Sequence, residues 1–400
     1  MTVQRNNNIL VAIRRETAIN VQATATGATE IRVTPSTGLE RKRAQIISNE
    51  KRTDLLKTMP RLGYITVDGS YNAELTVGGA TDLLLEAVNR GAWATATSIT
   101  FATMTSVQLV SNAVVATGGS WITQGIKVGD IFQITGTTVS ADNNLNVRAL
   151  SVSTLTIGVA TGTYVTLAST ATGTLTVLKK LVNPATPVRY SHTIEQYDAD
   201  TDLSELFTGC RCVGCKISFK PGQDTTVAYT FAGVDRVALA TGTSPYFTTP
   251  SLTTGLALIS EDSSLRYNGA AVATFTGLDI DFQIASKGEG VIGSFNTPDI
   301  FDDDLTVSAS IMGLVSDFSN LALFDAETEF ALSIKLEEPN TGPPKSCLSF
   351  YLPRVKIGAR QAPVGGGDGA KVETLPLLVA PKVATATDDA GDVTIHSTAP

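Results

Sequence analysis

The sequence predicts a mainly β protein, and two observations carry that prediction. The chain of 400 residues contains 34 glycines and only 17 % charged residues, and it is rich in Thr, Ala and Val. Such a composition favours sheets joined by turns, because long amphipathic helices need more Glu, Lys, Leu and Arg. Several segments also alternate apolar and polar residues with a period of two, as strands with one buried face do. A predominantly helical fold is thereby excluded.

Composition also excludes several function classes. The formal net charge of −8 argues against nucleic-acid binding through a global basic surface. The chain has no run of eighteen apolar residues, so no transmembrane helix is expected, and residues 1–15 lack the apolar core of a secretory signal. Four cysteines in a chain of this length do not make a disulfide framework. We expect a protein of the reducing cytoplasm, or of a particle assembled there.

The first 92 residues should open the main domain. Residues 1–35 are interpreted as an arm with one early strand. Residues 39–61 hold seven cations and three carboxylates with little apolar periodicity, which predicts a long exposed loop. Residues 65–77 alternate over thirteen positions and predict a strand with a bulge or bend at Gly69.

One short helix should flank that strand. It is expected from Asp82 to about Arg90, because Thr81 is a suitable N-cap and Gly91 a suitable stop. A carboxylate at Asp82 is also favourable beside the positive N-terminus of a helix.

Residues 93–182 are predicted to form a separate, small β domain inserted into the main one. The segment is built of Thr, Ala, Val, Gly and Ser in short β-rich runs. Between residues 94 and 178 the only charged side chains are Lys127, Asp130, Asp142 and Arg148. We expect this insert to lie on the outer surface of the protein.

The main domain should resume at residue 183 and run to 358. Asp317 is a suitable cap for a helix of one or two turns over 318–324. Residues 359–400 begin near the flexible glycine run 365–369 and are predicted to be a C-terminal arm with weak strands. Strands are predicted from the same alternation over 188–195, 207–219, 225–234, 278–284, 305–314, 329–337 and 347–357.

Histidine and cysteine chemistry finds little support. His192 is interpreted as a partly buried structural side chain of a strand, and His396 as part of a disordered chain end. The three cysteines of a C-x-C-x-x-C run and one distant cysteine are enough thiolates for a zinc ion. Strand alternation, however, would turn the third cysteine to the opposite face of the first two. These cysteines are Cys210, Cys212, Cys215 and Cys347.

Two acidic patterns also have ordinary interpretations. Asp198, Asp200 and Asp202 match the first ligands of an EF-hand loop, but its sixth and twelfth positions lack the required Gly and Glu. Asp279 and Asp281 lie two residues apart on one predicted strand face, and such pairs usually face solvent rather than a glycosidic bond. We predict no catalytic residue, no cofactor and no bound metal.

The order of the motifs resembles that of the tail tube (major tail) proteins of long-tailed bacteriophages. The resemblance covers the chain except residues 93–182. Early motifs are Val67-Asp68-Gly69-Ser70-Tyr71, Glu74-Leu75 and Asp82-Leu83-Leu84. Later motifs are Tyr190 to Glu195, Phe207-Thr208-Gly209-Cys210, Phe275-Thr276-Gly277, an Asp-rich loop and Leu352-Pro353-Arg354-Val355-Lys356.

The resemblance implies a tail-tube-type β-sandwich or half-barrel over residues 1–92 and 183–358. It implies that six copies form a ring and that rings stack head to tail into a tube, which conducts DNA from the capsid to the host. The implied partners are the chain itself and the tail tip, terminator and tape-measure proteins, with no membrane. The implied location is the tail of the virion, assembled in the host cytoplasm, and the family has no catalytic residues.

Two sets of residues fit that role independently. A strand face with Asp68, Glu74, Asp279 and Asp281 would repel DNA and let it slide through without specific binding. The basic segment 39–61 is expected to bridge one ring to the next, and the acidic segment 279–304 to receive it at the opposite end of the subunit. The candidate inter-ring residues are Arg41, Lys42, Arg43, Lys51, Arg52, Leu55 and Leu56.

An alternative function belongs to another class. Thr-rich β modules such as residues 93–182 also occur in adhesin-like multi-domain proteins that bind a carbohydrate or a surface receptor. The missing secretory signal and the scarcity of cysteines count against that interpretation.

Overall fold

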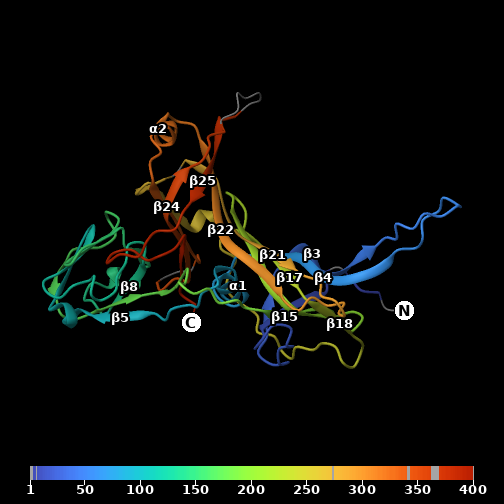
Figure 1. Ribbon diagram of the computed structural model, residues 1–400. Coiled ribbons are helices and arrows are strands. Elements are labelled where there is room, and N and C mark those ends of the chain that lie inside the picture. The colour runs from blue at the N-terminus through green and yellow to red at the C-terminus, as the bar shows by residue number, and fades with distance from the viewer. Residues whose placement is uncertain (1–2, 6, 273, 340–342, 362–368, 400) are drawn as a thin grey trace.

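The computed structural model describes residues 3–399 except 6, 273, 340–342 and 362–368. Within these residues the fold is mainly β, as predicted, with two α-helices. Figure 1 shows a central β body, a smaller domain on one side of it, and a long hairpin that projects from the other side.

Six long strands form the part of the main sheet on which the functional argument rests. Each strand is antiparallel to its neighbours. Their buried face contributes Tyr71, Tyr229 and Phe282 to the core, while the opposite face is polar. In spatial order the strands are β3 (Val33–Ile46), β4 (Arg61–Glu74), β17 (Thr226–Gly233), β16 (Leu203–Phe219), β21 (Phe275–Gly288) and β22 (Ile300–Leu314).

The first half of β16 extends into a second group of strands. It pairs with β15 (His192–Asp198) on one side and β18 (Asp235–Leu239) on the other. β15 in turn pairs with β1 (Ile9–Arg15), which pairs with β2 (Thr29–Ile31). One continuous strand therefore ties the two groups together.

The strands expected in the C-terminal arm form, and they are part of the main sheet. β25 (Val372–Val379) lies between β22 and β24 (Cys347–Ile357). The remaining strands are β23 (Phe330–Glu337), β26 (Thr394–Ser397), β14 (Lys179–Val182), β19 (Ser263–Tyr267) and β20 (Ala270–Ala271), paired directly or through one another with β24. Of the glycine run 365–369, only Gly369 is among the described residues.

The prediction of a loop over residues 39–61 is wrong for the first part of this segment. β3 continues to Ile46 and pairs with β4 almost to its end, so Arg41, Lys42 and Arg43 lie on a strand. Only residues 47–60 connect the two strands. The alternation is missing because the outer part of this hairpin projects from the body with both faces exposed, so no face needs apolar side chains. At Gly69 a side chain would lie 2.0 Å from the carbonyl oxygen of Gly38 on β3, so the close approach of the strands requires glycine there.

Two helices form where the sequence places them, with different ends. α1 (Ala80–Asn89) begins after Gly79, and Thr81 is buried inside it instead of capping it. Arg90, with φ of 54°, takes the left-handed position expected for Gly91. α1 packs against β16 and β21 on the buried face of the sheet. α2 (Ser319–Asp325) begins beside Asp317, whose side chain accepts a hydrogen bond from the Ser319 backbone at 2.8 Å.

The insert has its own core, which ends at Val177, and β14 (Lys179–Val182) pairs with the main sheet instead of belonging to the insert. Buried residues from Ile99 to Val177, with Phe101, Trp121 and Phe132 among the largest, form a cluster separate from that of the main body. One sheet holds β10 (Ser151–Val152), β11 (Thr156–Gly158), β7 (Ala113–Ala116), β6 (Val107–Val110) and β12 (Leu167–Thr170). The other holds β5 (Thr97–Thr100), β13 (Thr174–Val177), β8 (Ile131–Thr135) and β9 (Val147–Arg148).

Candidate functional site

The open face of the six long strands, here called the polar face, collects the four carboxylates that the sequence singled out. Residues directly opposite one another in an antiparallel ladder point to the same side of the sheet. Glu74 lies opposite Thr226, which lies opposite Ser218, which lies opposite Asp279. The parallel rows that contain Asp68 and Asp281 follow the same pattern. The structure therefore brings Asp68, Glu74, Asp279 and Asp281 to one face.

Small uncharged side chains fill most of the space between these carboxylates. The polar face exposes no aromatic ring at these central positions, and at Gly214 it exposes backbone. The residues are Ser70, Asn72, Thr226, Ala228, Thr230, Ser218, Gln283, Thr306, Ser308 and Ser310. A shallow hollow of about 690 Å³ lies over Gly214 and Ala228, with Lys216 and Asp281 in its wall.

The polar face is less acidic than the four carboxylates alone suggest. The Lys42 ammonium nitrogen lies 2.7 Å from a carboxylate oxygen of Asp68, and Lys216 lies 3.7 Å from Asp279. Arg32 is paired with Glu74 at 3.1 Å. Each pair has at least one side chain that is about one third exposed or more, so each contributes only about 0–1 kcal/mol to stability. They mainly lower the local density of negative charge.

Sequence reasoning missed further members of this face. Asp304 lies on β22 in the same alternating series as Thr306 and Ser308, and it is exposed. The strand was predicted to begin at residue 305, so Asp304 was assigned to the acidic loop before it, whereas β22 begins at Ile300. Glu40 and Lys42 were missed as wall residues because β3 was expected to be a loop.

The candidate inter-ring residues separate into two groups. Lys51, Arg52, Leu55 and Leu56 lie in the exposed connection 47–60, as expected. The three cations on β3 are engaged with the body of the protein instead. Arg41 is 3.4 Å from Asp235, Lys42 is paired with Asp68, and the Arg43 guanidinium lies 4.8 Å from the ring centre of Phe295.

The cysteines are all buried and unbridged. A register shift between Cys212 and Gly214 inserts one extra residue into β16, so Cys215 returns to the core side with Cys210 and Cys212. The expectation that Cys215 faces the other side is therefore wrong. Burial raises the pKa of all four thiols, to about 12 for Cys212 and Cys347. In the part of the chain that the structure describes, no three His, Cys, Asp or Glu residues are grouped as metal ligands.

His192 is fully buried in β15, beyond the partial burial expected. Burial, and next the positive charge of Arg15, lower the pKa of its imidazole to about 3. In the unfolded chain the His192 imidazole binds a proton below about pH 6.5, whereas in the folded chain it does so only below about pH 3. Protonation therefore favours the unfolded state between these values, and the free energy of unfolding falls as the pH drops below about 6.5.

We therefore expect the free energy of unfolding to fall by about 2 kcal/mol from pH 7 to pH 5 through His192 alone. Urea unfolding at the two pH values measures it. A His192→Gln variant should show a flatter dependence on pH, and an equal slope in both proteins would contradict this assignment.

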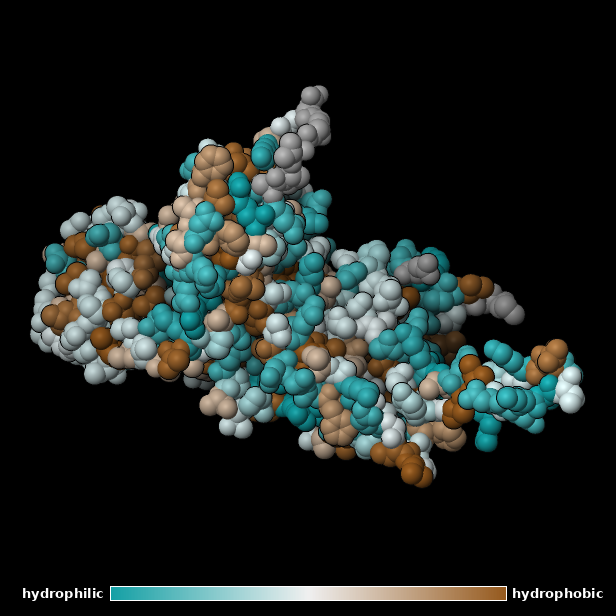
Figure 2. All heavy atoms as spheres, turned by 45° about the horizontal axis from the view of Figure 1, so that its top comes forward, coloured by the Kyte–Doolittle hydropathy of each residue, from teal (hydrophilic) through white to brown (hydrophobic). Residues whose placement is uncertain are grey.

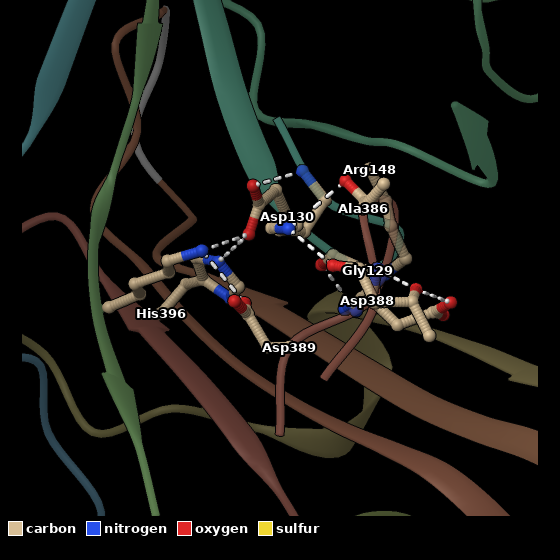
Figure 3. Close-up of polar contacts among 10 residues, drawn as sticks. Gly129, Asp130, Arg148, Ala386, Asp388, Asp389 and His396 are labelled. Carbon is tan, nitrogen blue, oxygen red and sulfur yellow. Dashed lines mark hydrogen bonds and ion pairs between the residues drawn. The ribbon is translucent and has the colours of Figure 1, made fainter. Parts of the chain in front are cut away.

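A buried ionic cluster joins the insert to the main body (Figure 3). Asp130 of the insert is 3.2 Å from the ammonium nitrogen of Lys180 on β14 and 3.2 Å from Nε2 of His396 on β26. Its other oxygen accepts a hydrogen bond from the Lys127 backbone at 2.8 Å. Lys180 also binds Asp389 at 2.7 Å. The interpretation of His396 as part of a disordered end is wrong, because its side chain is fully buried.

The protonation states in this cluster follow from burial and charge. Burial alone would raise the pKa of Asp130, but the His396 hydrogen bond and Lys180 keep it below its usual value. Burial lowers the pKa of His396, so its imidazole is neutral at pH 7 and donates the Nε2 proton to the Asp130 carboxylate. The cluster was missed because its contacts join Asp130 and Lys180 to Asp389 and His396, more than 200 residues further along the chain.

The chain was compared with known protein families and with curated proteins. A family model described as phage tail tube protein matches residues 6–379, which is nearly the whole chain. No curated protein matches the chain. Among the described residues, none of the helices has the length and apolar character needed to cross a lipid bilayer. With its mainly β fold and its match over residues 6–379, the chain belongs to the phage tail tube protein family, whose members are structural components of the virion tail.

Proposed function

We propose that this protein is the repeating subunit of a phage tail tube, in which six copies close into a ring and the polar face lines the channel. The observation that carries the proposal is that face. One side of the six strands packs on the core and α1, while the other side presents small polar residues. A sheet that is open on one side and covered on the other fits the wall of a wide barrel.

The free edges of the six strands support closure of the ring. Within the described residues, β3 is paired only with β4, and β22 is paired beyond β21 only from Ser308 onward. Residues 300–307 of β22 therefore have no second strand beside them, and the carbonyls of Asp302 and Asp303 accept hydrogen bonds from the Arg189 and Arg90 side chains. Such edges tend to pair with another chain. Because the six strands alternate in direction, β3 of one copy and β22 of the next would meet antiparallel in a rotational ring.

Charge supports the same edge pairing. β3 carries Arg41, Lys42 and Arg43, and the free part of β22 carries the exposed Asp303 and Asp304. The ladder row of Thr306 on β22 ends at Gly38 on β3, so the polar-face residues of β3 near the level of Asp304 are Glu40 and Lys42. The proposed ring has the stagger that sets Lys42, rather than Glu40, against Asp304. Pairing of the two edges would therefore continue both the sheet and its polar face from one subunit to the next.

The composition of the polar face suits passage of DNA. Its carboxylates outnumber its cations, since Asp281 and Asp304 have no ion pair in the described part of the chain. Duplex DNA carries one negative charge per roughly 1.7 Å and binds walls that release its counterions. Bases stack on aromatic side chains, and the central wall positions mostly hold Ser, Thr, Ala and Gly instead. Tyr64, nearer the hairpin, is an exposed aromatic residue in the same alternating series of β4. DNA would slide along such a wall.

The other two parts of the chain take outer positions in this arrangement. The insert contacts the main body through β14, β23, β24 and the C-terminal segment, none of which is among the six wall strands. It would lie outside the ring. The hairpin tip with Lys51, Arg52, Leu55 and Leu56 would reach the next ring. The tail tip, terminator and tape-measure proteins are the further partners proposed, with assembly in the host cytoplasm.

Assembly of the purified chain tests the proposal. Concentrated protein should form hollow tubes of even width with a regular axial repeat in negative-stain electron microscopy, and sedimentation should show a concentration-dependent polymer. Protein that stays monomeric over a range of salt and concentration, while remaining folded by circular dichroism, would contradict it.

A further inference from the structure

The tip of the projecting hairpin is strongly apolar for an exposed segment. Leu55 is 93 % exposed, Met59 87 % and Leu56 67 %, and Ile46, Ile47 and Leu62 are exposed beside them. Figure 2 shows apolar atoms at the end of this projection. Within the described chain, Lys51, Lys57 and Arg61 have no ion pair, so the tip is both apolar and basic. Exposed apolar patches rimmed by charge mark interaction sites.

A second unpartnered apolar surface lies around α2, here called the α2 patch. The helix has no buried residue, and Phe318 before it is 70 % exposed. Phe324 of α2 is also exposed, as are Leu314 at the end of β22 and Val372, which lies opposite Leu314 on β25. Asp317 and Asp325 are exposed and have no ion pair in the described part of the chain, so this patch is apolar with unpaired carboxylates. Lys371 is the nearby cation.

Strand register places these two surfaces at opposite ends of the subunit. One row across the sheet runs from Glu74 on β4 to Ser310 on β22, and α2 follows β22 beyond that row. The hairpin tip lies beyond Arg61, at the other end of β4. Figure 1 shows α2 and the hairpin on different extremities of the body. In a head-to-tail stack, the tip end of one copy faces the α2 end of another.

The acidic segment 279–304 does not serve as the opposite end, contrary to expectation. Phe295 accepts a hydrogen bond from the Ile65 backbone at 2.7 Å, so this segment packs at the base of the same hairpin. Asp299 and Asp302 of this segment form ion pairs with Arg211 of the same subunit, at 2.8 Å and 3.0 Å.

We propose that the hairpin tip of one copy seats on the α2 patch of a copy in the adjacent ring. The proposal rests on the proposed function and names the surface that the hairpin meets. Leu55, Leu56 and Met59 would be buried against Phe318 and Phe324, and the cations of the tip would face Asp317 and Asp325. Burial of large apolar side chains supplies the strength of the contact, and charge supplies its polarity.

Disulfide trapping in assembled tubes tests this contact. A Leu56→Cys, Phe318→Cys variant should form a ladder of covalent oligomers on a non-reducing gel after mild oxidation of its tubes. The native cysteines are buried and should not react. The matched control Leu56→Cys, Leu155→Cys, with its second cysteine on the insert, should give no ladder. Tubes that give no ladder with the first variant would overturn this contact, whereas wild-type protein that forms no tubes would instead contradict the proposed function.

A charge exchange supplies an independent readout. Lys57→Glu and Asp325→Lys should each shorten the tubes at low salt at least threefold, and the double variant should restore at least half of the wild-type length. Two single variants with wild-type tubes, or a double variant no better than either single, would contradict the pairing.

Discussion

Replacing Asp130 with alanine should lower the free energy of unfolding by about 3–5 kcal/mol, the range for breaking a buried ion pair on one side. The side chain of Asp130 is 1 % exposed and serves Lys180, His396 and the Lys127 backbone at once. Its removal leaves the Nε2–H of His396 and the Lys127 N–H without their acceptor in a buried site. Lys180 retains Asp389, which limits the loss.

Urea unfolding and limited proteolysis measure this effect. Proteolysis should cut first at residues near 93–96 and 178, where the insert joins the body. Asp130→Asn keeps a hydrogen-bond acceptor at this position, so its free energy of unfolding should fall by less than that of Asp130→Ala. Asp224→Ala, at an exposed carboxylate with no side-chain hydrogen bond or ion pair in the described part of the chain, is the matched control and should change stability by less than about 0.5 kcal/mol. An Asp130→Ala protein as stable as the control would show that the cluster does not hold the insert.

Reversing the charge at Asp304 should raise the concentration needed for assembly at least tenfold without unfolding the subunit. In the proposed ring, Asp304 of β22 faces Lys42 of β3 in the next copy. A lysine at position 304 would face a like charge, and like charges at an interface cost several kcal/mol. A cost of about 1.4 kcal/mol already weakens an association constant tenfold. Asp304 is exposed and has no ion pair within the described residues, and its charge acts at longer range on Arg90. We expect Asp304→Lys to leave the monomer folded, which circular dichroism checks.

Sedimentation against concentration, at low and high salt, measures the effect of Asp304→Lys. High salt should restore part of the assembly by screening. Asp224→Lys reverses the charge of another exposed aspartate away from both edges and should assemble normally. Equal assembly of the two variants at low salt would argue against closure through β3 and β22.

The wall of the proposed channel was largely readable from sequence. Residues 65–77 and 278–284 alternate cleanly because one face of β4 and β21 packs on the core and the other is open. That alternation brought Asp68, Glu74, Asp279 and Asp281 to one face. The ion pairs that offset them were not readable, since Lys216 and Lys42 lie on strands whose neighbours are set by topology.

Other features depend on tertiary context that a local pattern does not carry. β3 is a strand without alternation because its outer half has no core to cover. One extra residue in β16 reversed the expected side of Cys215. β26 is only four residues long and forms because β14 and β24 lie on its two sides. His396 is buried for the same reason, through contacts with residues far away in the sequence.

A helical reconstruction of tubes by electron cryomicroscopy tests the central claim most directly. We predict a channel wall made of β3, β4, β17, β16, β21 and β22, with Asp281 and Asp304 facing the lumen and the insert on the outside. β3 of each copy should lie beside β22 of its neighbour in the ring. A channel lined by α1, by the insert or by the α2 patch would contradict the account.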